Sequence, residues 1–94
     1  MKFILTFTWA PDARVRAEAI ERFQKTGGLP PEGVTLLGRW TRVDLSGGFD
    51  LLETTDPKKL TQFAYMWNDL MALQITPVLE DQHLSEVFQS APKQ

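Results

Sequence analysis

GVTLLGRWTRVDLSGGFDLLETT, residues 33–55, is the stretch that decides the fold. Two runs rich in Val, Leu, Thr and aromatic residues flank a loop that ends in Ser46-Gly47-Gly48. Glycine adopts positive φ without steric cost, so this pattern is typical of a β-hairpin. We predict its strands near residues 34–43 and 48–55.

Strands are also predicted on both sides of this hairpin. Residues 2–9 and 73–79 alternate between two kinds of side chain with the period of two that marks a strand. Pro77 cannot donate a ladder hydrogen bond, which indicates an edge position or a bulge. The hairpin therefore belongs to a four-stranded sheet.

Helical spacing of apolar residues predicts two helices and a terminal one. The first runs from Ala13 to about Lys25 and ends at a Gly-Gly pair, and the second runs from Lys58 to about Leu70. A short polar helix follows Glu80-Asp81. The apolar stripes of the first two helices are Ala13, Ala17, Ala19, Ile20 and Phe23, and Leu60, Phe63, Ala64 and Trp67.

The element order β-α-β-β-α-β plus a terminal helix predicts an α+β, ferredoxin-like fold: a four-stranded antiparallel sheet with both helices on one face. Ninety-four residues suit one domain, 1–94.

Alternation assigns the strand residues to two faces. The helix-facing set is Phe3, Leu5, Phe7, Val34, Leu36, Trp40, Phe49, Leu51, Leu73 and Ile75. The other set is Ile4, Thr6, Thr8, Leu37, Arg39, Thr41, Asp50, Leu52, Thr54, Gln74, Thr76 and Val78. A bulge at Gly38 would exchange Arg39 and Trp40. The second set is half polar, as a sheet-on-sheet homodimer or an enclosed pocket requires.

Composition excludes several classes of function. The net charge of −2 provides no footprint for nucleic acid or an anionic membrane, and the absence of cysteine excludes thiolate chemistry. No apolar run approaches the roughly 20 residues that span a bilayer, and the first residues read directly into a strand, so we expect a cytoplasmic protein. His83 is the only histidine, and no metal or cofactor is predicted.

The sequence resembles a family of short bacterial proteins catalogued as domain of unknown function 3303. The likeness rests on Gly38-Arg39-Trp40, Phe49-x-Leu51-x-Glu53, Trp67-Asn68-Asp69-Leu70 and Thr76-Pro77-Val78-Leu79, and on the segment at 27–34. It implies a dimeric α/β-barrel-like subunit in which two ferredoxin-like sheets face each other. It implies no activity, and the monooxygenases and isomerases that share such a fold do not lend theirs by analogy.

Five residues are candidates for a binding site. Arg39 would clamp an anion, or it would pair with Glu53 or Asp50 across the hairpin. Trp40 and Trp67 would wall an aromatic ligand, or they would be core residues. Glu53 would act as a base, or it would be paired or exposed at the strand end.

Asp69 lies at the unfavourable end of a helix for an anion, which indicates a specific partner in the next turn or on another subunit.

These residues support two hypotheses. The first is a homodimeric interaction or small-molecule-binding module, joined through the open sheet face and holding a small hydrophobic ligand. The alternative is a cofactor-independent enzyme, monooxygenase- or isomerase-like, that acts on a hydrophobic or aromatic small molecule. In that enzyme Arg39 would orient the substrate and Glu53 or Asp69 would move a proton.

Overall fold

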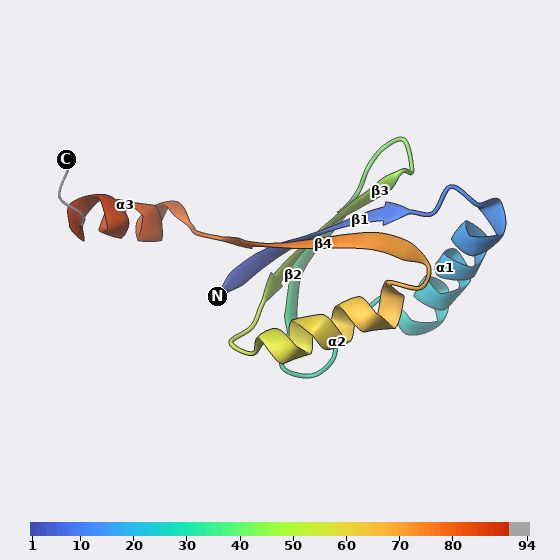
Figure 1. Cartoon of the computed structure of the whole chain (residues 1–94), viewed down its shortest axis with the longest axis horizontal. Coiled ribbons are helices and arrows are strands. Elements are labelled where there is room, and N and C mark those ends of the chain that lie inside the picture. Colours follow the sequence, from blue (N-terminus) through green and yellow to red (C-terminus); the bar gives the residue numbers. More distant parts are fainter. Residues whose placement is uncertain (91–94) are drawn as a thin grey trace.

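The chain forms an antiparallel four-stranded sheet and three helices (Figure 1). A computed structural model describes residues 1–90. The elements are β1 (Lys2–Trp9), α1 (Ala13–Thr26), β2 (Thr35–Thr41), β3 (Gly47–Glu53), α2 (Pro57–Trp67), β4 (Met71–Val78) and α3 (Asp81–Ser90). The strand order is β2-β3-β1-β4. The predicted α+β, ferredoxin-like plan is confirmed.

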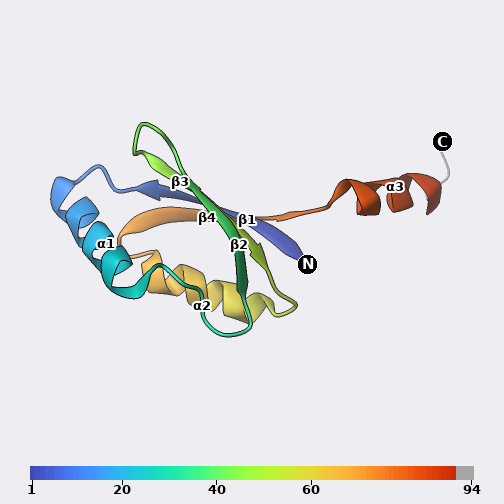
Figure 2. The same ribbon diagram turned by 180° about the vertical axis from the view of Figure 1, so that it is seen from behind.

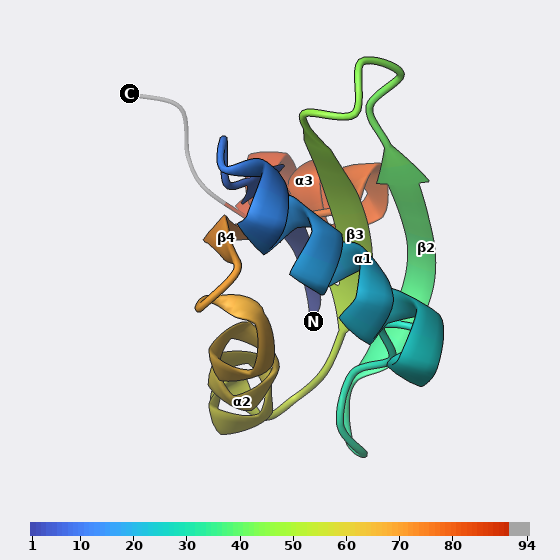
Figure 3. The same cartoon turned by 90° about the vertical axis from the view of Figure 1, so that its right-hand side faces the viewer.

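The two edges of the sheet are β2 and β4. Strand β4 lies nearest the viewer in Figure 1 and β2 nearest in Figure 2. Pro77 therefore occupies an edge strand, where its missing N–H leaves no gap in the sheet. Helices α1 and α2 share one face of the sheet (Figure 3). The other face, which we call the open face, carries no helix from residues 1–90.

Local sequence signals start and stop the helices. The Asp12 side chain accepts hydrogen bonds from the first turn of α1, and the Asp56 side chain accepts one from the Lys58 N–H of α2 at 2.9 Å. Gly27 ends α1 in the left-handed conformation with φ of 71°. Pro57 occupies the first turn of α2, where its missing N–H is tolerated.

The core lies between the helix-facing side of the sheet and α2. Leu52 is fully buried, and Leu5 and Phe63 are 3% exposed. The buried cluster consists of Leu5, Phe7, Val34, Leu52, Leu60, Phe63 and Trp67. The apolar stripe predicted for the second helix is confirmed, since its three largest members are all in this cluster.

The predicted faces of β3 were wrong. Phe49 and Leu51 were expected under the helices, yet Asp50 and Leu52 point there. Alternation could not decide, because each face of this strand carries bulky apolar residues. The pairing of β1 with β3 fixes the faces. Leu5, a core residue of β1, lies directly opposite Asp50, and residues directly opposite each other point to the same face of the sheet.

A bulge in β2 reverses the predicted faces of Arg39 and Trp40. Leu36 pairs with Leu52 and Gly38 pairs with Leu51, so Leu37 is the extra residue. Arg39 therefore points to the helix side, and Trp40 stands on the open face with 57% of its surface exposed.

The apolar stripe predicted for α1 was also wrong in part. Ala19 is buried, but Ala13 and Ala17 are exposed and Ile20 and Phe23 are 39% and 45% exposed. The side chains of Val15, Arg16 and Arg22 are half-buried instead. Arginine stems can cover apolar surface, as Arg22 does while its head donates to the Asp69 carboxylate, so an apolar pattern alone misplaces this face.

Helix α3 extends away from the rest of the chain at the end of β4 (Figure 1). All of its residues are exposed, including Leu84, Val87 and Phe88 at 40%, 47% and 71%. An ion pair between Lys2 and Glu80 ties the start of this arm to β1. The arm contributes to a longest dimension of 53 Å against a thickness of 18 Å.

Candidate functional site

Arg39 is held in an ion pair with Asp50 on the helix side of the hairpin. Its Nε donates to Asp50 Oδ1 at 2.7 Å and its Nη2 donates to Oδ2 at 3.1 Å. The same guanidinium donates to the carbonyl oxygens of Gly28 at 2.6 Å and Gly27 at 3.3 Å. Asp50 is 2% exposed. Four of the five donors of the guanidinium fork are thus engaged within the chain.

The end of α1 is shaped to receive this guanidinium. Gly27 and Gly28 both have positive φ, which turns two carbonyl oxygens toward Arg39. A Cβ on Gly28 would lie 2.5 Å from Arg39 Nη1 and 2.9 Å from the Phe23 ring. The Phe23 ring lies against the guanidinium carbon at 5.3 Å. This cluster fastens α1 to β2 and β3, which is a structural role.

Asp69 is paired with Arg22 of α1. Nη1 and Nη2 of Arg22 donate to its two carboxylate oxygens at 3.0 and 2.9 Å, and Nη1 also donates to the Met66 carbonyl at 2.7 Å. The bond from Arg22 lowers the pKa of Asp69 below its ordinary value. Arg22 thereby places a cation at the C-terminal end of α2, where the helix dipole favours it. The partner that the sequence predicted for Asp69 exists, but it lies on the first helix.

Glu53 and Trp67 lie apart from these two ion pairs, one at the surface and one in the core. Glu53 is exposed at the end of β3, opposite Lys2 and Thr35 in the register. Trp67 is 8% exposed in the core, and Arg22 lies 5.6 Å from its ring centre.

The five candidate residues are therefore not brought together. Arg39 and Trp67 lie on the helix side of the sheet, whereas Trp40 stands on the open face. Trp40 and Trp67 therefore cannot enclose one ligand. Neither Glu53 nor Asp69 approaches the Arg39 guanidinium, whose partners are Asp50 and the two glycine carbonyls. The described residues offer no convergent catalytic set built from these five.

Trp40 instead belongs to an aromatic and cationic patch on the open face. It lies opposite Phe49, which is half-buried, and the guanidinium of Arg42 stacks 4.9 Å from the Phe49 ring centre. Arg42 forms no ion pair within residues 1–90. The sequence indicated Trp40 but not Arg42, because only the register shows that Arg42 stacks on Phe49.

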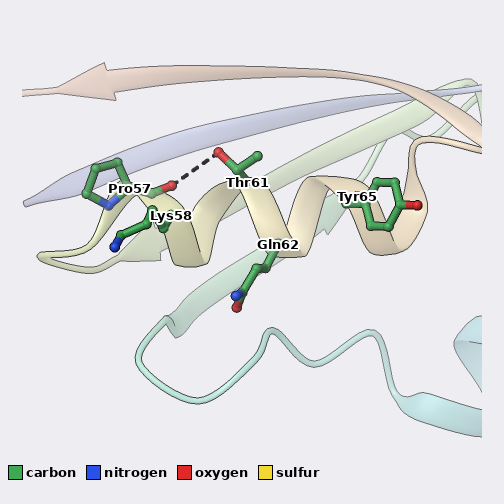
Figure 4. A pocket seen from close by; sticks show the side chains of 5 residues that line it. All are labelled: Pro57, Lys58, Thr61, Gln62 and Tyr65. Carbon is green, nitrogen blue, oxygen red and sulfur yellow. Dashed lines mark hydrogen bonds between the residues drawn. The ribbon is translucent and has the colours of Figure 1, made fainter.

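The surface of residues 1–90 includes the following two hollows. One of about 520 Å³ lies along α2, lined by five residues that Figure 4 labels. The Thr61 hydroxyl there donates to the Pro57 carbonyl at 3.2 Å, and Lys58 is the only charged residue of its lining.

The other hollow, which we call the arm cleft, measures about 660 Å³ and lies between α3 and the adjoining ends of β1, β3 and β4. Its lining includes Lys2, Glu53, Leu79, Glu86 and Val87. His83 lines it too, and no group of three metal-ligating side chains occurs among residues 1–90.

Within the same residues, no helix is long and apolar enough to cross a membrane.

These features define a small α+β protein with a ferredoxin-like sheet, an open face and an exposed terminal helix. The chain belongs to the family described as a domain of unknown function, DUF3303, whose model matches residues 1–92. A comparison with curated proteins found no match. The description of this family names no activity.

Proposed function

We propose that this protein is a homodimeric binding module. Two copies join through their open faces and hold a small hydrophobic or aromatic ligand beside Trp40. The observation that carries the proposal is the exposure of Trp40, 57%, on a sheet face that no helix from residues 1–90 covers.

The composition of the open face supports this arrangement. Ile4, Phe49 and Leu51 are half-buried on it, and Thr6 of β1 lies opposite both Phe49 and Gln74 of the edge strand β4. A face of this mixed character suits a partner that covers the apolar residues and leaves the polar ones near water or ligand. A second copy brings the same surface, which a two-fold axis matches to itself.

A binding role fits the described residues better than a catalytic one. The groups that would have moved a proton or clamped a substrate are held in pairs or lie apart, as for Arg39 and Asp69. Trp40, Phe49 and Arg42 provide aromatic surface and one cation, which bind a flat, anionic or neutral molecule without chemistry. The proposal includes a cytoplasmic location, which cell fractionation would test.

Sedimentation equilibrium of the purified chain tests the dimer. We expect a dimer at micromolar concentration, and we expect Trp40→Glu to shift the equilibrium toward monomer at least tenfold. Tyr65→Glu is the matched control, because Tyr65 is 77% exposed on α2, away from the open face. A wild-type chain that stays monomeric at 100 micromolar would refute the dimer.

The ligand site is tested with 1-anilinonaphthalene-8-sulfonate, an aromatic anion that becomes fluorescent in apolar sites. We expect saturable binding to the wild-type dimer, strongly reduced in Arg42→Ala and in Trp40→Glu. Equal binding to all three proteins would place the dye elsewhere and contradict the ligand part of the proposal.

A further inference from the structure

The loop between β2 and β3 exposes two apolar side chains at its tip. Val43 is fully exposed and Leu45 is 59% exposed. Leu45 also adopts a left-handed backbone with φ of 62°, a conformation that a leucine adopts only at an energetic cost. A hairpin that only had to turn would place glycine or asparagine there.

The tip is nevertheless well ordered. The Arg42 N–H donates to the Gly47 carbonyl at 2.7 Å, and the Leu45 N–H donates to the Arg42 carbonyl at 2.9 Å. Asp44 accepts from both the backbone N–H and the hydroxyl of Ser46, at 3.0 and 2.7 Å. Because the loop is already fixed, binding through its tip would lose little conformational entropy.

The arm cleft has the complementary character. Leu79 and Val87 give it apolar walls that are 60% and 47% exposed. Glu53 and Glu86 add two carboxylates that form no ion pair within residues 1–90. The tip carries Arg42 without an ion pair, as described above, while its one acid, Asp44, is turned to Ser46.

The tip cannot reach the cleft of its own chain. β1 pairs Thr8 with Gly47 at the tip end of the sheet and Lys2 with Glu53 at the cleft end. Six residues of strand separate the two ends by about 20 Å. In Figure 1 the loop rises on the side of the sheet opposite α2, and α3 lies beyond the other end.

We propose that the hairpin tip of each copy inserts into the arm cleft of a second copy of this chain. This inference rests on the open-face dimer proposed above and specifies how its two copies are oriented. When two open faces meet with antiparallel strands, each tip lies over the partner's cleft end, and the two-fold axis forms the contact twice. The cleft then covers Val43 and Leu45, and Arg42 approaches Glu53 and Glu86 of the other copy.

The natural chain has no cysteine, so paired cysteines give a background-free test. We expect the full-length double variant Leu45→Cys/Val87→Cys to form a disulfide-linked dimer under mild oxidation. The matched control, Leu45→Cys/Tyr65→Cys, keeps the same tip thiol and moves the second to the outer surface of α2. It should cross-link at least tenfold more slowly.

Three outcomes are distinguishable. Preferential cross-linking of the Val87→Cys pair between chains supports the inference. Equal rates for the two pairs, in a protein that sediments as a dimer, would overturn the inference and leave the open-face proposal standing. A disulfide within one chain would also overturn it, because the tip would then reach its own cleft.

A charge variant gives a second measurement on a protein that needs no thiol chemistry. Arg42→Glu should raise the dimer dissociation constant about tenfold. Arg14→Glu makes the same charge change at an exposed position of α1 and should leave the constant within twofold. Equal effects of the two substitutions would contradict the inference.

Discussion

The carboxylate of Asp50 is buried in the hairpin, where it pairs with Arg39. Asp50→Ala leaves Arg39 without its charge partner near the core, which should lower the free energy of unfolding by about 2–4 kcal/mol. Urea denaturation followed by circular dichroism measures this loss. The double variant Arg39→Met/Asp50→Leu should be less destabilised than Asp50→Ala, and the opposite order would show that the pair stabilises beyond mutual neutralisation.

Asp69 provides a prediction about pH. Its hydrogen bond with Arg22 lowers its pKa in the folded protein, so the pair contributes stability above the ordinary pKa of 3.8 and loses it as pH falls through the lowered value. The pair is more than half exposed on the acid's side, so we expect Asp69→Asn to cost no more than about 1 kcal/mol at pH 6. The gap between wild type and variant should narrow as pH falls below 3.8, and a gap that stays constant would contradict this account.

At the scale of single residues, the sequence was informative where a charged side chain stands in a place that requires a partner. It indicated that Asp69 needs a specific partner, and for Arg39 it left open an anion clamp or an ion pair across the hairpin. It could not choose between Asp50 and Glu53, because the choice depends on a register that the loop leaves open. It also could not place Arg22, since an arginine in an amphipathic helix gives no signal of which helix end it will cap.

At the scale of elements, two glycines in the hairpin provide a matched comparison. A Cβ on Gly48 would lie 2.1 Å from the Trp40 carbonyl oxygen, which is fixed backbone, whereas a Cβ on Gly38 would meet only the ring of Trp40, at 2.7 Å. The ring belongs to a side chain with 57% of its surface exposed, so it can shift more easily than backbone can. We expect Gly48→Ala to cost more than about 2 kcal/mol and Gly38→Ala less than about 1 kcal/mol, by denaturant unfolding. Similar losses would show that the Trp40 ring is fixed in place.

Elements were predicted well because their ends carry local chemistry. Asp12, Gly27, Asp56 and Pro57 act within a turn of their own position, so their effect can be read without knowing the fold. Strand faces were predicted less well. The bulge at Leu37 and the two apolar faces of β3 become visible only when neighbouring strands are paired.

At the scale of the whole molecule, α3 is too short to be stable as an isolated helix in water, and none of its residues is buried. In the dimer proposed above, a second copy would supply the contacts that stabilise this helix. If the dimer is the folded unit, a hundredfold rise in chain concentration should raise the melting temperature by several degrees, because association stabilises the folded state. Differential scanning calorimetry measures this, and Trp40→Glu should show a melting temperature that does not depend on concentration.

The extra residue in β2 has a consequence for how this surface can vary. The bulge at Leu37 sets Arg39 and Trp40 on opposite sides of the sheet, so substitutions at these two neighbouring positions have different consequences. A substitution at Arg39 removes contacts that hold α1 to the hairpin, so it affects the stability of the fold. A substitution at Trp40 changes a side chain that is exposed on the open face. A substitution at Trp40 can therefore alter the open face without touching the ion pair between Arg39 and Asp50.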